Sequence, residues 1–85
     1  MSLEKSLKKR NEELQQKLII EIEKAKTGGS NKNIMQLQTI LNELRNNYAI
    51  EKKYLNYPHI IIDSWDYSDQ LGNELIELAE LYKMK

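Results

Sequence analysis

Apolar residues recur at steps of three, four or seven positions along the first third of the chain, which places them on one stripe of a helix. The stripe consists of Leu3, Leu7, Leu14, Leu18, Ile22 and Ala25. Ser2 could cap this helix, but Asn11, followed by Glu12 and Glu13, is the better N-cap, because its side chain and the two carboxylates suit the positive end of a helix. We therefore expect a helix that is firm from Asn11 onward, with frayed residues before it.

Two glycines end this helix. Gly28 and Gly29 follow two lysines, an order typical of a helix C-terminus that closes with a left-handed residue. Ser30 and Asn31 are candidate N-caps for a second helix, whose apolar positions recur at coiled-coil spacing. This second stripe consists of Ile34, Leu37, Leu41, Leu44, Tyr48 and Leu55. Two stripes joined by a short glycine turn predict an antiparallel helical hairpin over residues 3–55.

The pattern changes at Pro58, since proline disfavours a helical conformation at the preceding residue and has no amide hydrogen to donate. Three β-branched residues, Ile60, Ile61 and Ile62, follow it. We therefore expect a packed, extended connector over residues 56–67. Helix-capping residue types follow the isoleucines, namely Asp63, Ser64, Asp66 and Ser68.

A third apolar stripe defines a shorter C-terminal helix over residues 68–83, with Asp69 in its first turn. The stripe consists of Leu71, Leu75, Leu78 and Tyr82. The chain is thus predicted to be all-α, with one small domain over residues 1–85. In this domain an antiparallel helical hairpin and a short third helix are joined by the extended Ile-rich connector.

The charges cancel overall but are unevenly distributed. Thirteen basic and thirteen acidic residues remove the global positive field expected of a DNA-coating protein. Residues 1–30 carry seven basic and five acidic side chains, residues 31–56 four and two, and residues 57–85 two and six. We expect the acidic C-terminal segment to fold back on the basic part and neutralise it.

Composition narrows the class of protein further. The chain has no cysteine, which excludes disulfides and thiolate metal sites. No apolar run approaches the ~20 residues of a membrane span, and the N-terminal stretch lacks the apolar core of a signal peptide. We therefore expect a cytoplasmic protein. Eleven lysines against two arginines are typical of an AT-rich bacterial or phage genome.

The candidate chemical groups do not form a catalytic, metal or cofactor pattern. His59 could act as a general base only with a nucleophile and an orienting acid around it, and Ser64 and the nearby aspartates are the sole candidates. Asp63, Asp66 and Asp69 lack the EF-hand spacing, so we assign them to helix capping. We expect a protein that is not an enzyme and binds no cofactor.

Aromatic residues concentrate beside the isoleucines, where four of the six lie between Tyr54 and Tyr67. They either cover the open end of the hairpin as a small core or form a protein-binding surface, for which tyrosine and tryptophan are well suited. The candidates for such a surface are Tyr54, Tyr57, His59, Trp65, Asp66, Tyr67 and Asp69. A basic cluster that could contact nucleic-acid phosphates consists of Lys5, Lys8, Lys9 and Arg10.

The hairpin sequence LQQKLIIEIEKAKTGGSNKNIMQLQTILNELRNNY resembles the small two-helix sporulation phosphatases that dephosphorylate response regulators, in length, turn placement and the closing LNELRNNY. The resemblance implies a helical hairpin that acts on phosphorylated signalling proteins. The Ser-Gln-Glu-Leu-Asp signature of that family falls here on Gln38, Thr39, Ile40, Leu41 and Asn42. Only the leucine matches, so the acidic catalytic function of the family does not carry over.

Self-association is expected because Ile19, Met35 and Ile40 lie beside the main stripes and need cover. A homodimer that pairs two hairpins in a four-helix core would provide it. We therefore predict a small non-enzymatic protein-interaction or regulatory module that binds itself and another protein. A regulator of phosphorylated signalling proteins and a nucleic-acid-associated protein are the alternatives.

Overall fold

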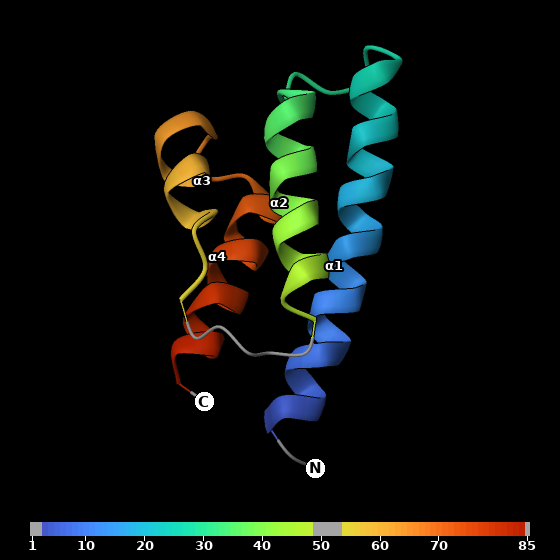
Figure 1. Cartoon of the computed structure of the whole chain (residues 1–85). Helices are drawn as coiled ribbons and strands as arrows, with labels where there is room; N and C mark the ends of the chain where they lie inside the picture. The colour runs from blue at the N-terminus through green and yellow to red at the C-terminus, as the bar shows by residue number, and fades with distance from the viewer. Residues whose placement is uncertain (1–2, 49–53, 85) are drawn as a thin grey trace.

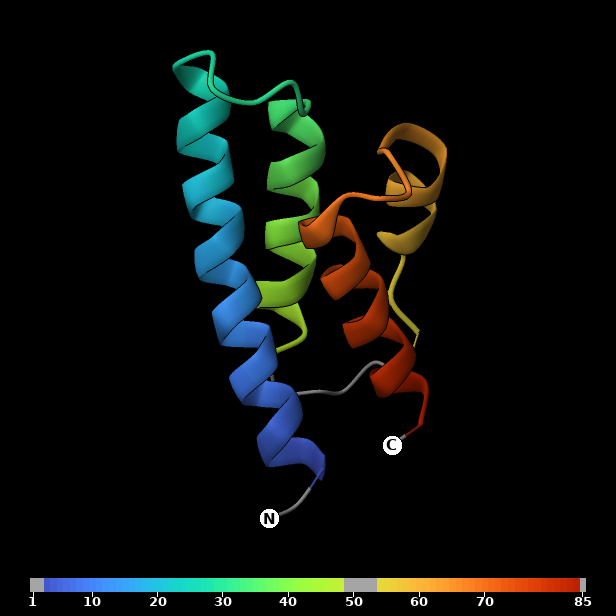
Figure 2. The ribbon, with the colours of Figure 1, turned by 180° about the vertical axis from the view of Figure 1, so that it is seen from behind.

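Four α-helices make up the described part of the chain, which in this computed structural model comprises residues 3–48 and 54–84. They are α1 (Leu3–Lys26), α2 (Ile34–Asn46), α3 (Pro58–Ser64) and α4 (Gln70–Lys83). α1 and α2 form an antiparallel hairpin, α4 packs on this hairpin, and α3 lies on the outer side of α4 (Figure 1; Figure 2). The predicted all-α fold and its helical hairpin are confirmed.

The turn between α1 and α2 follows the glycine pattern of the sequence. Gly28 adopts a left-handed conformation with φ of 84°, which a residue with a Cβ atom adopts only at a cost. Its amide and that of Gly29 donate to the carbonyls of Ala25 and Lys24, so the last turn of α1 closes as a Schellman motif. The N-cap of α2 is Asn33, whose side chain accepts from the Gln36 amide, rather than the predicted Ser30 or Asn31.

The core combines the predicted stripes of α1, α2 and α4. All three helices bury leucines that recur at helical spacing, and α3 adds a smaller contribution. The buried apolar side chains are Leu7, Leu14, Leu18, Ile22, Leu37, Ile40, Leu41, Leu44, Tyr57, Ile61, Leu75, Leu78, Ala79 and Tyr82. Burial of this apolar surface is the main favourable contribution to folding.

Asn11 is not the N-cap of the first helix, and that prediction is wrong. α1 begins at Leu3, eight residues earlier, because Leu7 in the first turns is itself buried. Asn11 lies inside α1 with its side chain in the core, where Nδ2 donates to the Leu44 carbonyl over 3.0 Å and to Tyr82 Oη over 2.7 Å. One amide therefore joins α1 to both α2 and α4.

The second helix is shorter than predicted. α2 ends at Asn46 with Asn47 as its C-cap, and Leu55 lies beyond it, so the hairpin does not continue to residue 55. Residues 49–53 lie outside the described residues. After this gap, the Glu43 carboxylate accepts hydrogen bonds from the backbone amides of Asn56 and Tyr57, over 2.6 and 2.8 Å. The carboxylate on α2 thus fixes the point where α3 begins.

The isoleucine segment is helical, and the predicted extended connector over residues 56–67 is wrong. Pro58 occupies the first turn of α3, where its fixed φ suits a helix and its missing amide is not needed. In helical geometry only Ile61 is buried, whereas Ile62 is 69% exposed. The proline therefore begins a helix instead of introducing an extended segment.

α4 begins at Gln70 and ends at Lys83, close to the predicted 68–83. Asp69 is its N-cap, one position before the first turn in which we expected it, and its Oδ2 accepts from the Gly72 amide over 2.7 Å.

The acidic C-terminal helix pairs with the basic first helix, as the charge distribution predicts. Arg10 lies 3.0 Å from Glu77, and Lys17 lies 2.6 Å from Glu74. Among the helices of the described residues, none is long and apolar enough to cross a membrane.

Candidate binding site

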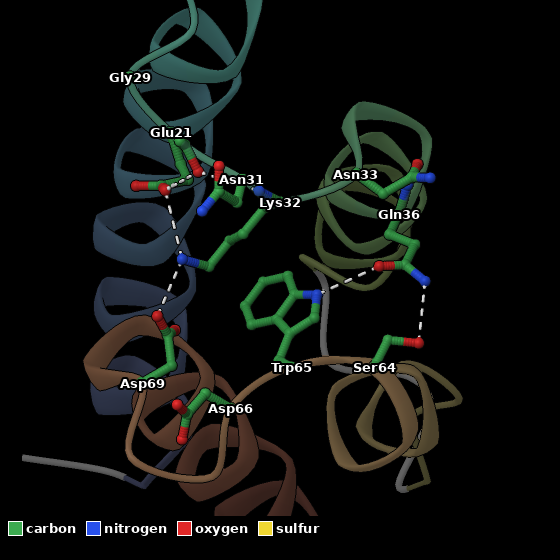
Figure 3. A pocket seen from close by; sticks show the side chains of 11 residues that line it. Glu21, Gly29, Asn31, Lys32, Asn33, Gln36, Ser64, Trp65, Asp66 and Asp69 are labelled. Carbon is green, nitrogen blue, oxygen red and sulfur yellow. Dashed lines mark hydrogen bonds and ion pairs between the residues drawn. The ribbon is translucent and has the colours of Figure 1, made fainter.

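A polar pocket of about 590 Å³ opens between the α1–α2 turn and the loop that joins α3 to α4 (Figure 3). It brings together residues from both halves of the sequence. The lining consists of Glu21, Gly29, Ser30, Asn31, Lys32, Asn33, Gln36, Ser64, Trp65, Asp66 and Asp69. Because the two loops meet here, the pocket exists only when the C-terminal half is docked on the hairpin.

Lys32 is the central charged group of one wall. Its ammonium lies 2.8 Å from Asp69 Oδ1 at the start of α4 and 3.3 Å from Glu21 Oε2 on α1. The Ser30 hydroxyl donates to the same Glu21 oxygen over 2.6 Å and accepts from the Lys32 amide. This set of four residues, which we name the Lys32 clasp, ties the hairpin turn to α4 (Figure 3).

Trp65 forms the floor of the pocket at the end of α3. Its Nε1 donates to Gln36 Oε1 over 3.3 Å, and Gln36 Nε2 donates to the Ser64 hydroxyl over 3.1 Å. The Lys32 ammonium lies 5.2 Å from the centroid of the indole ring, within the range of a cation–π interaction. A Cβ atom on Gly72 would lie only 3.1 Å from Trp65 Cε3, so the indole also packs closely on α4.

The clasp shifts the pKa values of Glu21 and Lys32 toward their charged forms. The hydrogen bond from Ser30, with a further contribution from Lys32, lowers the pKa of Glu21 despite partial burial. Burial alone would lower the pKa of Lys32, but the hydrogen bonds and charges of Asp69 and Glu21 outweigh it and raise that pKa. These groups therefore stay ionised across the physiological pH range.

Asp66 and Tyr67 lie at the outer rim of the site. Asp66 Oδ1 accepts from both the amide and the hydroxyl of Ser68, over 2.9 and 2.8 Å, and these bonds lower the pKa of Asp66. Tyr67 is 92% exposed. The loop thus holds an ionised carboxylate in a hydrogen-bonded turn beside a fully accessible aromatic ring.

The structure divides the seven predicted interaction residues into three groups. Trp65, Asp66, Tyr67 and Asp69 belong to one loop, and three of these line the pocket. Tyr54 is exposed but precedes α3, so it lies at the opposite end of that helix, and His59 is exposed on the first turn of α3. Tyr57 is the exception to the predicted surface.

Tyr57 is fully buried, so its placement on a binding surface is wrong. Its hydroxyl donates to the Leu75 carbonyl over 2.6 Å. Burial, together with the nearby Tyr82 and Glu43, raises the pKa of Tyr57 strongly. Its ring anchors α3 on α4. For this residue the small core, rather than the binding surface, is therefore the correct interpretation.

The four basic residues considered for nucleic acid lie on exposed positions of the first turns of α1. Arg10 is paired with Glu77, and the Lys8 ammonium lies 5.9 Å from the centroid of the Tyr48 ring. Contacts within the chain therefore engage Lys8 and Arg10, and Lys5 and Lys9 occupy the same exposed stretch.

The five residues aligned with the phosphatase signature lie on α2. Ile40 and Leu41 are buried in the core, and the exposed members are Gln38, Thr39 and Asn42. The Thr39 hydroxyl donates to the Met35 carbonyl over 2.8 Å. The exposed face of α2 at this point thus presents amides and a hydroxyl, and no carboxylate.

Glu21, Lys32 and Gln36 are among the pocket residues that the sequence analysis did not single out as site residues. Glu21 and Gln36 occupy polar positions beside helical stripes, a pattern typical of any solvated helix face. Lys32 lies in a turn, 37 positions before Asp69. A lone cation in a polar turn was the available signal, and it specifies no partner.

The described residues contain no group of three or more histidines, cysteines, aspartates or glutamates placed to hold a metal ion. Comparisons with protein-family models, with curated proteins and with solved structures gave no match.

Proposed function

We propose that this chain is a non-enzymatic interaction module that binds another protein through the loop between α3 and α4. The proposed surface, which we name the loop face, consists of Trp65, Asp66, Tyr67 and Asp69 with the adjoining pocket. The observation that carries this proposal is the 92% exposure of Tyr67 beside a pocket whose floor is Trp65. Tyrosine and tryptophan are the residues most enriched where proteins bind one another.

The loop face is preorganised, which favours binding because less conformational entropy is lost. Ser68 holds Asp66, Gln36 holds the indole of Trp65, and Lys32 holds Asp69. Tyr67 therefore projects from a loop whose neighbours on both sides have fixed partners. A rigid aromatic side chain on such a support is suited to act as an anchor for a partner protein.

Self-association receives less support than the sequence suggested. Of the three side chains that we expected to need cover, Ile40 is fully buried within the chain and Ile19 is partly buried, whereas Met35 is 76% exposed. The cover of Ile40 therefore comes from within the chain, where a second subunit was expected to provide it. The homodimer stays a prediction, and light scattering at micromolar concentration tests it.

Site-specific photo-crosslinking in the cells that make this protein tests the loop face. A photoreactive phenylalanine analogue replaces Tyr67 in one variant and Tyr54 in the matched control. Both tyrosines are exposed, but they lie at opposite ends of α3. We expect adducts with a second protein from position 67 and far fewer from position 54. Equal yields at the two positions, or none at position 67, would contradict the proposal.

A further inference from the structure

The pocket contains one carboxylate whose charge no cation of the described residues offsets. Lys32 lies between Glu21 and Asp69, and Asp69 also caps the positive end of α4. Asp66 instead accepts its hydrogen bonds from Ser68, which is neutral. The six ion pairs of the described residues all join other side chains. Asp66 therefore lines the pocket as an exposed carboxylate with no ion-pair partner among the described residues.

The N-termini of two helices offset part of the net negative charge of the pocket. α2 and α4 both begin at its rim, capped by Asn33 and Asp69, and each N-terminus acts as roughly half a positive charge. Three carboxylates are thus balanced by one ammonium and about one further positive charge from the two helices. The lining side chains alone carry two more carboxylates than ammonium groups, an excess that the helix N-termini and the nearby Lys24 reduce and that favours a cation over an anion.

We propose that the pocket receives one basic side chain, an arginine, from an extended segment of the partner protein, with its guanidinium beside Asp66. This inference rests on the proposed protein-binding function of the loop face and names the chemistry that the partner presents. Arginine is favoured over lysine because its planar guanidinium matches a carboxylate with two parallel hydrogen bonds.

The chain's own Lys32 shows that the pocket suits a cationic side chain. Its ammonium lies near the indole ring of Trp65 and within ion-pair distance of two carboxylates, with the side chain about one-fifth exposed. The volume of about 590 Å³ leaves room beside it for a second long side chain. Amide and hydroxyl groups of Asn31, Asn33 and Ser64 line the same space and offer hydrogen-bond partners to the backbone of an extended segment.

Trp65 is the sole tryptophan of the chain, so its indole N–H gives one isolated NMR signal that reports on the pocket. The probe is a blocked pentapeptide with a central arginine, Gly-Ser-Arg-Ser-Gly, titrated into the full-length chain labelled with nitrogen-15. The matched probe replaces the arginine with citrulline, which has almost the same shape and no charge. We expect a saturable shift of the Trp65 signal with the arginine peptide and at least fivefold weaker binding of the citrulline peptide.

Two aspartate variants locate the contact. Asp66→Asn keeps an oxygen that can accept from Ser68, so the loop is retained while the charge is lost. Asp63→Asn removes an equal charge from an exposed position on α3 that does not line the pocket. We expect Asp66→Asn to weaken the arginine peptide about fivefold and Asp63→Asn to weaken it by less than twofold. The backbone spectrum of each variant verifies that the fold is intact.

The outcomes separate this inference from the proposed function. Equal binding of the arginine and citrulline peptides, equal effects of the two aspartate variants, or no shift of the Trp65 signal would each overturn the arginine site. If Tyr67 still forms crosslinks in that case, the loop face remains a protein-binding surface with a different partner chemistry. Arginine binding without crosslinks at Tyr67 would support the arginine site in the pocket and contradict the loop face as a protein-binding surface.

Discussion

The side-chain amide of Asn11 donates to the hydroxyl of Tyr82 over 2.7 Å, although the two residues are 71 positions apart. The same amide group donates to the Leu44 carbonyl, one of the last carbonyls of α2, which lack partners within their own helix. Both residues of the Asn11–Tyr82 pair are fully shielded from solvent. A single polar side chain thus sets the registry of three helices.

Replacement of Asn11 by alanine should destabilise the fold by about 2–3 kcal/mol, because a buried hydroxyl and a buried carbonyl lose their donor. Tyr82→Phe removes one of the two partners and should cost about 1 kcal/mol. Urea unfolding followed by circular dichroism measures both variants and the double mutant. If Asn11→Ala unfolds at the same urea concentration as the parent chain, the amide does not have this role.

Ser30→Ala should raise the pKa of Glu21 toward its ordinary value, since the Ser30 hydrogen bond is the largest cause that lowers it. The folded pKa of Glu21 lies below the unfolded one, so its stabilising contribution is present above pH 4.5 and is lost as pH falls through the folded value. As pH decreases through the acid range, the free energy of unfolding of Ser30→Ala should therefore fall less steeply than that of the parent chain. Carbon-13 NMR titration of the carboxylates gives the pKa directly.

Ser68→Ala is the matched control for that titration. It removes the hydroxyl that donates to Asp66 and leaves the backbone amide in place. The pKa of Asp66 should therefore rise only part of the way toward its ordinary value. Glu21 should not respond to it. A rise in the pKa of Glu21 in both variants would show that the clasp and the Asp66 turn are not separate.

Tyr57→Phe should cost about 1 kcal/mol at neutral pH, because the Leu75 carbonyl loses a buried hydrogen bond. Burial raises the folded pKa of Tyr57 above the usual value of 10, so the folded state retains a proton that the unfolded state loses. Stability should fall as pH rises above 10, and Tyr57→Phe should flatten this loss. Thermal unfolding measured between pH 9 and pH 11, a range centred on the usual tyrosine pKa of about 10, gives this loss of stability. An identical alkaline slope in parent and variant would refute the assignment.

Gly72→Ala should destabilise the chain by about 1 kcal/mol. The added methyl would lie 3.1 Å from both Ile61 Cγ2 and Trp65 Cε3, and crowding of this kind costs about 1–3 kcal/mol. The better helix propensity of alanine returns about 1 kcal/mol. A shift in Trp65 fluorescence should accompany the change. Gly29→Ala is the control, since its closest new contact would be 3.4 Å, and its tryptophan emission should match the parent's.

Most of the fold could be predicted because the spacing of apolar residues within each helix indicates which of its positions are buried. Leu14, Leu18 and Leu75 occupy core positions that their spacing indicated. The error at α3 had a physical cause: a proline suits both the residue after a helix and the first turn of the next one. Three isoleucines favour a strand only where neighbouring strands exist to pack against, because β-propensity depends on context.

The site was predicted only in part, since its residues come together through tertiary contacts. Trp65, Asp66, Tyr67 and Asp69 stood out by composition, and the structure gathers them in one loop. Lys32 and Glu21 join them across a long stretch of chain, for which no spacing rule exists. Tyr57 has the same residue type as Tyr67 and the opposite environment, which only packing decides.

The 71 positions between Asn11 and Tyr82 also bear on the order of folding. Closing that loop costs about 0.6 kcal/mol more entropy than closing the 33-position loop from Asn11 to Leu44, because the cost grows with the logarithm of loop length. The hairpin should therefore assemble first, and α4 should dock after the rate-limiting barrier. Truncation of Leu78 should then mainly accelerate unfolding, whereas Gly28→Ala in the hairpin turn should mainly slow folding, a difference that the two arms of a chevron plot resolve.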